Sequence, residues 1–243
     1  MNIDVIMLIS GLSPDELKRR EEGLKAYASS GTNIRLVTTS WAPPSVDSLP
    51  EMELAASGIL KRAVKSEEEG ADAVIIWGGH DPSVSAARNL VSIPVIGPGM
   101  ASIHLACLLS ESFALIVQLP HVVGLAERQV RDLGLWDKCT GVYPVNLPVL
   151  ELRKPSSFTM IYDTVMEGVI EGADSICLGC MALNDHTETL QKKLEKEAHG
   201  VLVIHPGKAV IKITELILNL NLSHSKLSYP KPPKEVTFPS NPF

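Results

Sequence analysis

One cysteine of this chain occupies a position where a thiol can transfer protons. The stretch EGADSICLGC (171–180) is apolar in the manner of a buried strand, and Cys180 follows Gly179 at its end, ahead of a predicted helix start at MALND. Parallel α/β sheets bind ligands outside the carboxyl ends of their strands, and backbone N–H groups at a helix start can lower a thiol pKa. Cys180 is therefore the first candidate catalytic residue. The alternative is a buried core cysteine, which is the prediction for mid-strand Cys177.

A second copy of this strand ends without a thiol. Within the stretch EGADAVIIWGG (69–79), residues 69–78 align without a gap on 171–180, and Gly78 then matches Cys180, 102 positions away (180 minus 78). PVIGPG (94–99) is similarly repeated as LVIHPG (202–207), and a predicted helix follows each. These matches predict two similar lobes related by a pseudo-twofold axis. In that arrangement Gly78 and Cys180 are expected to face each other across the cleft between the lobes.

Short apolar runs alternate with amphipathic stretches along the chain, which predicts an α/β fold with parallel sheets. Each lobe is expected to hold a mainly four-stranded parallel sheet flanked by helices. The predicted strands are 3–8, 34–39, 73–77, 94–97, 113–119, 140–145, 175–179 and 201–204, and helix periodicity covers 14–30, 52–69, 102–111, 124–134, 158–172, 189–200 and 207–220. The first lobe is predicted to span 1–103 plus 207–243, with the last helix and tail packing back, and the second lobe 104–206.

Other polar groups are expected near the same strand ends. His80 is the candidate second base because imidazole titrates near neutral pH, although it can instead bond Asp81 and shape the turn. His205 is predicted to contact substrate or to orient Cys180, and His121 is a weaker candidate. An enolate-like intermediate needs preorganised donors, for which the backbone at Gly79, His80 and Met181 is suitable. The remaining candidate substrate-binding residues are Ser10, Ser13, Thr39, Ser40, Gly78, Tyr143 and Gly179.

Composition excludes several classes of protein. The hydrophobic fraction is 45% and the charged fraction 21%, which is ordinary for a folded domain. The formal charge is −6, and Lys and Arg are not clustered with aromatic residues, so no nucleic-acid partner is expected. Neither a signal peptide nor a membrane-spanning run is recognisable. We therefore expect a cytoplasmic protein with no membrane partner, in which the four cysteines stay reduced.

No metal or cofactor is predicted. CLGC (177–180) has the C-x-x-C spacing, but a structural zinc site needs a second pair of ligands and a redox pair normally sits at a helix start. Asp185 and His186 are adjacent rather than four residues apart on one helix face. GPGMAS (97–102) has neither the Walker spacing nor G-x-G-x-x-G, which argues against a nucleotide site.

The chain resembles a known enzyme family. GADAVIIWGGHDPSVSAARNLVSIPVIGPGMASIHLA (70–106), GADSICLGCMA (172–182) and LSHSKLSYPKPP (222–233) look like the hydantoin racemase branch of the aspartate/glutamate racemase superfamily, in the expected order. The resemblance implies a cofactor-independent enzyme of two flavodoxin-like lobes. It also implies that two cysteines act as general acid and general base on opposite sides of a carbon α to a carbonyl.

The chain departs from that family pattern at the first cysteine. Cys180 matches the second family cysteine, whereas the first falls at Gly78, as in arylmalonate decarboxylase, and the family's Asn-rich turn is replaced by ISGLS (9–13). Three hypotheses follow. The first is a racemase or epimerase that uses Cys180 with a partner such as His80, and the second is a decarboxylase in which Cys180 alone protonates an enolate. The third is a protein that binds a small acid or cyclic amide without turnover. A small-molecule substrate and a homo-oligomer are expected.

Overall fold

The computed structural model describes residues 1–197 and 200–238, which divide into two compact α/β units. The first unit comprises Met1–Val46, Pro50–Gly97 and Val210–Phe243, and the second comprises Asp47–Leu49 and Pro98–Ala209. The chain passes between the units at 97/98 and 209/210, within six residues of the predicted boundaries. The short segment Asp47–Leu49, which belongs to the second unit, has no counterpart in the predicted division.

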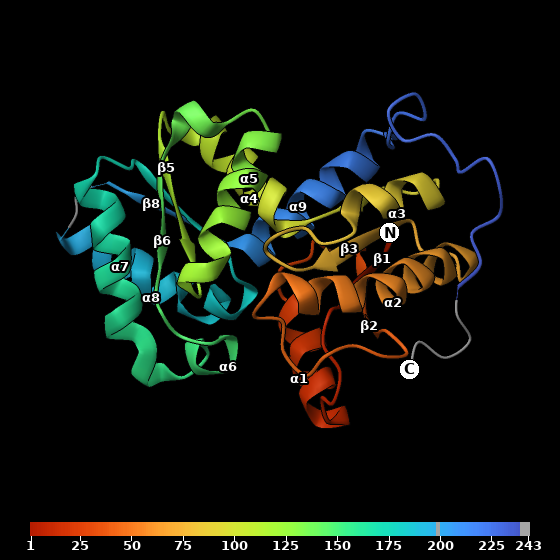
Figure 1. The fold of residues 1–243 in the computed structure, drawn as a ribbon, viewed down its shortest axis with the longest axis horizontal. Helices are drawn as coiled ribbons and strands as arrows, with labels where there is room; N and C mark the ends of the chain where they lie inside the picture. Colours follow the sequence, from red (N-terminus) through yellow and green to blue (C-terminus); the bar gives the residue numbers. More distant parts are fainter. Residues whose placement is uncertain (198–199, 239–243) are drawn as a thin grey trace. The chain divides into compact units, whose positions relative to one another are not determined.

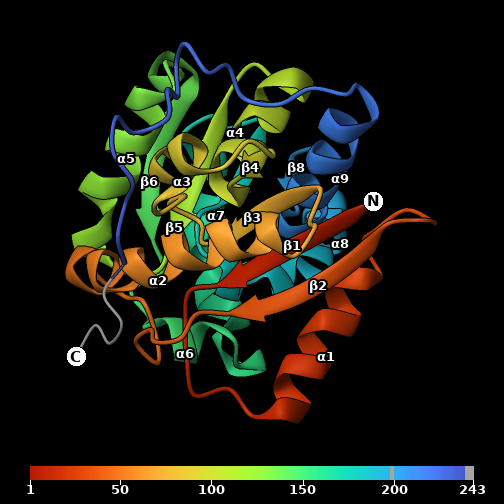
Figure 2. The same ribbon diagram turned by 90° about the vertical axis from the view of Figure 1, so that its right-hand side faces the viewer.

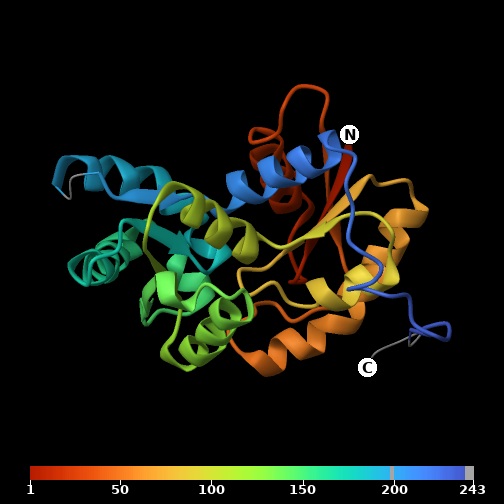
Figure 3. The same ribbon diagram turned by 90° about the horizontal axis from the view of Figure 1, so that it is seen from above.

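The first unit is built on a four-stranded parallel sheet in the order β2-β1-β3-β4 (Figure 2). Its strands are β1 (Asn2–Met7), β2 (Asn33–Thr38), β3 (Ala73–Trp77) and β4 (Val95–Ile96). Its helices are α1 (Pro14–Lys25), α2 (Leu49–Glu68), α3 (Val84–Leu90) and most of α9 (Pro206–Asn219). α1 and α9 lie on one face of the sheet, and α2 and α3 lie on the other (Figure 3). The central strands β1 and β3 are almost fully buried, as expected for strands covered on both faces.

The second unit repeats this topology with the strand order β6-β5-β7-β8. Its strands are β5 (Phe113–Val117), β6 (Cys139–Pro144), β7 (Ser175–Leu178) and β8 (Leu202–Ile204). Its helices are α4 (Pro98–Leu109), α5 (Val123–Asp132), the single turn α6 (Val149–Leu152), α7 (Phe158–Ile170) and α8 (Thr187–Glu197), together with short 3₁₀ turns. The prediction of two four-stranded parallel sheets flanked by helices is confirmed.

The two faces of the second sheet support separate apolar clusters. Alternate residues of β5 point to opposite faces, so Ala114 and Ile116 pack with α7 and α8 while Phe113, Leu115 and Val117 pack with α4 and α5. Figure 1 shows these two pairs of helices on opposite sides of the sheet. Helices on both faces require buried strands, which explains the continuous apolar runs in the sequence.

The repeated motifs fall at equivalent places in the two units. β3 and β7 are the third strands of their sheets, and Gly78 and Cys180 follow their ends. Pro98 and Pro206 open α4 and α9 directly after β4 and β8, so both copies of the second motif lead into a helix as predicted. The matched topology supports the inference of an internal duplication.

The C-terminal segment 223–229 binds the edge of the first sheet. His224 Nε2 accepts a hydrogen bond from the Val95 N–H of edge strand β4 at 2.5 Å. Lys226 Nζ donates to Arg88 O at the end of α3, and Arg88 in turn donates to the Tyr229 hydroxyl, both at 2.9 Å. These contacts cover the free edge that β4 would otherwise present.

We expect acid to weaken this attachment. Burial, followed by the charges of Arg88 and Lys226, lowers the pKa of His224 from 6.5 to about 4. The folded state thus favours neutral imidazole, so this stabilisation is complete above about pH 6.5 and is lost as the pH falls towards 4. After allowing for solvent screening, the loss should be about 1–2 kcal/mol.

Urea unfolding at pH 7 and pH 4.5 measures this loss. The matched variant is His224→Gln, because a glutamine oxygen can accept the same N–H without titrating. The wild type should lose more stability than the variant between the two pH values, and an equal loss would contradict the expectation.

Candidate functional site

Cys180 lies at the carboxyl edge of the second sheet, where the backbone of β7 ends. β7 runs beside β5, and the Gly179 N–H donates to Ile116 O at 2.8 Å as β7 ends. A Cβ on Gly179 would lie 3.1 Å from that carbonyl and from the side chains of Leu115 and Val117, so glycine suits this close approach. The chain then turns into a 3₁₀ segment (Met181–His186), closed by a hydrogen bond from Leu183 N to Cys180 O at 3.0 Å.

The Cys180 thiol is buried and neutral. Its residue is 7% exposed and belongs to the apolar cluster on the α7 and α8 side of the sheet. Its pKa is raised to about 11, chiefly by burial and also by the Asp47 carboxylate, while the Ala182 N–H and Arg153 oppose the rise. The Ala182 N–H lowers the pKa, as the sequence suggested for a helix start, but burial outweighs it and the net shift is upward. The thiol therefore carries its proton at pH 7.

The two cysteines of CLGC do not form a pair. Cys177 lies on the opposite face of β7, fully buried in the cluster with α4 and α5, and its thiol donates to Ser102 O at 3.7 Å. Cys177 is thus a core residue, as predicted. The alternation of side chains along a strand separates the two sulfurs, so neither a dithiol nor a shared metal site arises from this motif.

His205 lies at the same sheet edge as Cys180, because β8 pairs with β7 and His205 directly follows β8. Its Nδ1 accepts a hydrogen bond from Lys208 N at 3.3 Å in the first turn of α9. Burial, followed by the charge of Lys208, lowers the pKa of His205 to about 4. His205 is therefore a neutral imidazole at pH 7, and a bonded Nδ1 acceptor leaves the ring proton on Nε2.

The hydroxyl candidates of the first unit bond to the protein backbone. Ser10 Oγ donates to Ala42 O at 2.5 Å and Thr39 Oγ1 donates to Trp41 O at 2.8 Å, so both hold the loop that follows β2. Ser13 caps α1 by accepting from Glu16 N at 3.2 Å, and Ser40 is exposed. Ser10 and Thr39 thus organise this edge of the first sheet.

Gly78 begins a tight turn at the end of β3. Its carbonyl accepts from Asp81 N at 3.0 Å, and Asp81 adopts a left-handed φ of 53°. Gly79 and His80 form the middle of this turn, where both are half-buried. The turn is therefore closed by backbone bonds at the strand end where the sequence predicted a catalytic group.

Tyr143 and His121 are directed elsewhere in the second unit. The Tyr143 hydroxyl donates to Thr140 O at 3.5 Å and packs over Gly141, so it points back towards the start of β6 and away from the carboxyl edge. His121 Nε2 bonds to Asp47 O at 2.9 Å. Within the second unit, the carboxyl edge therefore brings together Gly179, Cys180, Met181 and His205.

Comparisons with known proteins show the family of this chain. Residues 13–214 match the family model described as Asp/Glu/Hydantoin racemase. The chain belongs to the Asp/Glu/hydantoin racemase family. The hydantoin racemase of Pseudomonas sp. (strain NS671) is 30% identical over 220 residues, which cover 88% of this chain and 86% of that protein. The prediction of an enzyme of this racemase superfamily is confirmed.

Solved structures extend the comparison to the whole fold. Allantoin racemase from Klebsiella pneumoniae has a TM-score of 0.88 at 26% identity and covers 98% of this chain and 96% of its own. Arylmalonate decarboxylase has a TM-score of 0.61 at 16% identity, with 89% and 92% covered, and therefore shares the fold. The two-lobe α/β prediction is confirmed by both.

The sequence did not predict that two charged residues, one acidic and one basic, act on Cys180. Asp47 and Arg153 both act electrostatically on the thiol, although they lie far from it in the sequence. Asp47 lies in the segment between β2 and α2, where Asp47–Leu49 belongs to the second unit, and no periodic pattern marks it. Such contacts follow from tertiary folding, for which a single sequence carries no spacing signal.

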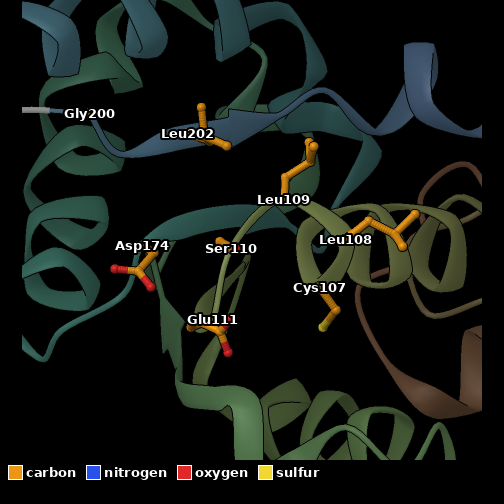
Figure 4. Close-up of a pocket in the computed structure, with 8 residues that line it drawn as sticks. All are labelled: Cys107, Leu108, Leu109, Ser110, Glu111, Asp174, Gly200 and Leu202. Atoms are coloured by element: carbon orange, nitrogen blue, oxygen red, sulfur yellow. The ribbon is translucent and has the colours of Figure 1, made fainter.

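A pocket of about 400 Å³ opens at the opposite, amino-terminal edge of the second sheet (Figure 4). It lies between the end of α4 and the starts of β5, β7 and β8, and its lining includes Glu111, Asp174 and three leucines. Ligands of α/β sheets bind at the carboxyl edge, so this pocket is separate from the Cys180 site. Within 1–197 and 200–238, no cluster of three His, Cys, Asp or Glu residues could hold a metal ion, and no helix is long and apolar enough to cross a membrane.

Proposed function

We propose that this chain is a cofactor-independent isomerase that inverts a carbon α to a carbonyl, in a hydantoin, an amino acid or a related small acid. The observation that carries the proposal is the place of Cys180, whose thiol lies at the carboxyl end of β7 ahead of a 3₁₀ turn. Family membership supports the reaction class. The similarity to the hydantoin and allantoin racemases supports a small cyclic amide as the substrate.

The proposed reaction consists of two proton transfers. A base removes the α proton, and the electron pair of the C–H bond becomes an enolate stabilised by hydrogen-bond donors at its oxygen. Cys180 then donates its thiol proton to the opposite face of the carbon, and the thiolate left behind recovers a proton for the next turnover. His80 is the proposed partner base. In the reverse direction the two groups exchange roles, as an isomerase requires.

The neutral state of Cys180 favours a second candidate, a decarboxylase. A thiol with a pKa near 11 is ready to donate a proton but is a rare base at pH 7. In a malonate-like acid, the bond to the leaving carboxylate breaks, carbon dioxide departs, and the electron pair forms the same enolate without a base. Cys180 would then protonate one face, and water would restore the thiol proton.

An exchange experiment in D₂O separates these candidates. The protein is incubated with enantiopure hydantoins, allantoin, amino acids and aryl- or alkylmalonates, and optical rotation, deuterium content and carbon dioxide are followed. We expect loss of optical rotation with one deuterium gained at the α carbon. Carbon dioxide release with a single product enantiomer would instead support the decarboxylase, and inactivity on every compound would contradict both.

A further inference from the structure

Asp47 is held on the second unit by two hydrogen bonds, although it lies in the loop between β2 and α2. Its Oδ1 accepts from Val149 N at 2.8 Å, and its carbonyl oxygen bonds His121 Nε2 at 2.9 Å. One partner therefore fixes the side chain and the other fixes the backbone. The carboxylate has a defined position beside the single-turn helix α6.

The bonded carboxylate supplies a cap that α6 lacks in its own sequence. Pro148 precedes Val149 and provides no side-chain acceptor, so the Val149 N–H is satisfied by Asp47. At the other end of α6, Leu152 O bonds His186 Nε2 at 2.7 Å. His186 ends the 3₁₀ turn that starts after Cys180, and Leu152 shares an apolar cluster with that thiol. Direct contacts thus connect Asp47 to the Cys180 segment through α6.

Charges of opposite sign act on the thiol from this region. The Asp47 carboxylate disfavours the thiolate, whereas the Arg153 guanidinium, next after α6, favours it. Arg153 also forms an ion pair with Asp185 of the 3₁₀ turn at 3.3 Å. The Asp47 carboxylate and the Arg153 guanidinium therefore act on the buried thiol in opposite directions.

We propose that Asp47 is a positioning residue of the Cys180 site, which caps α6, fixes the contacts that α6 makes with the Cys180 segment, and sets a negative charge within electrostatic reach of the thiol. In a proton-transfer enzyme this arrangement presents a protonated thiol to the enolate. The catalytic meaning rests on the proposed function. The effect of the Asp47 charge on the thiol is independent of the proposed function, because Asp47, Arg153 and Cys180 all belong to the second unit and act there without substrate.

The test is the alkylation of Cys180 by iodoacetamide in the full-length protein between pH 7 and pH 10. Peptide mass spectrometry follows Cys180 separately from the other three cysteines. Below the thiol pKa the rate is proportional to the thiolate fraction. Asp47→Asn keeps an acceptor oxygen for Val149 N but removes the charge, so the rate should rise roughly three- to ten-fold. Arg153→Gln should lower the rate by a similar factor.

The two variants are expected to change the alkylation rate in opposite directions, which distinguishes an effect of charge on the thiol from an effect of solvent access to the sulfur. Loosening of α6 would expose the sulfur and accelerate alkylation in both variants, which would overturn the proposal, as would unchanged rates. Asp163→Asn, an exposed carboxylate on α7, is the matched control and should leave the rate unchanged. Asp47→Ala should also lower the melting temperature because it removes the cap. Alkylation needs no turnover, so an inactive protein in the D₂O experiment would leave this test valid.

Discussion

Replacing Cys180 by serine should abolish most of the turnover and leave the fold intact. A serine hydroxyl is nearly isosteric with the thiol but is a much weaker acid, and it meets the same buried surroundings. General acid catalysis by a positioned group contributes about 10²–10⁴-fold, so kcat/KM should fall by a factor in that range. The measurement is the initial rate with the substrate identified by deuterium exchange, together with circular dichroism to verify folding.

Cys107→Ser is the matched control for this loss. Cys107 is a half-buried thiol near the end of α4, at the amino-terminal edge where the separate pocket opens. Its replacement should change kcat/KM by less than about two-fold, since surface or edge substitutions away from a site are usually mild. A Cys180→Ser enzyme that retains wild-type turnover would remove Cys180 from the mechanism.

Much of this fold follows from hydrophobic patterning. Each predicted strand overlaps an observed one, because a strand buried on both faces leaves a continuous apolar run in the sequence. The two missed helices are short: α3 has seven residues and α6 has four, too few to establish a helical period. β4 shrinks to Val95 and Ile96 because Pro94 precedes it and Gly97-Pro98 ends it.

The chemistry of the site is less accessible from sequence. The spacing of CLGC correctly separates a core thiol from one at a strand end, because alternation along a strand is a local rule. The protonation state of Cys180 is not local. It depends on burial by residues of α7 and α8 and on Asp47, 133 positions earlier (180 minus 47). Local reasoning identified the lowering of the pKa by a backbone N–H and missed the larger effect of desolvation.

Gly78→Cys should destabilise the first unit rather than simply supply a second thiol. A Cβ on Gly78 would clash with Leu8 Cδ1 and lie 2.9 Å from Pro82 Cδ. Leu8 is buried at 7% exposure, so it must change its rotamer within a packed core. Overpacking of this kind costs about 1–3 kcal/mol. Urea unfolding of the wild type and the variant measures the difference.

A double-mutant cycle with Leu8→Ala tests whether this clash is the cause. Leu8→Ala alone should destabilise the unit by leaving a cavity, and a cysteine at position 78 should partly fill it. The double variant should therefore be more stable than the sum of the two single losses predicts, by about 0.5–3 kcal/mol for directly coupled residues. Additive losses would mean that Leu8 does not block the position. With a favourable coupling, racemisation assays on the double variant become meaningful, because the clash of the new side chain with Leu8 is then relieved and the contact with Pro82 Cδ remains.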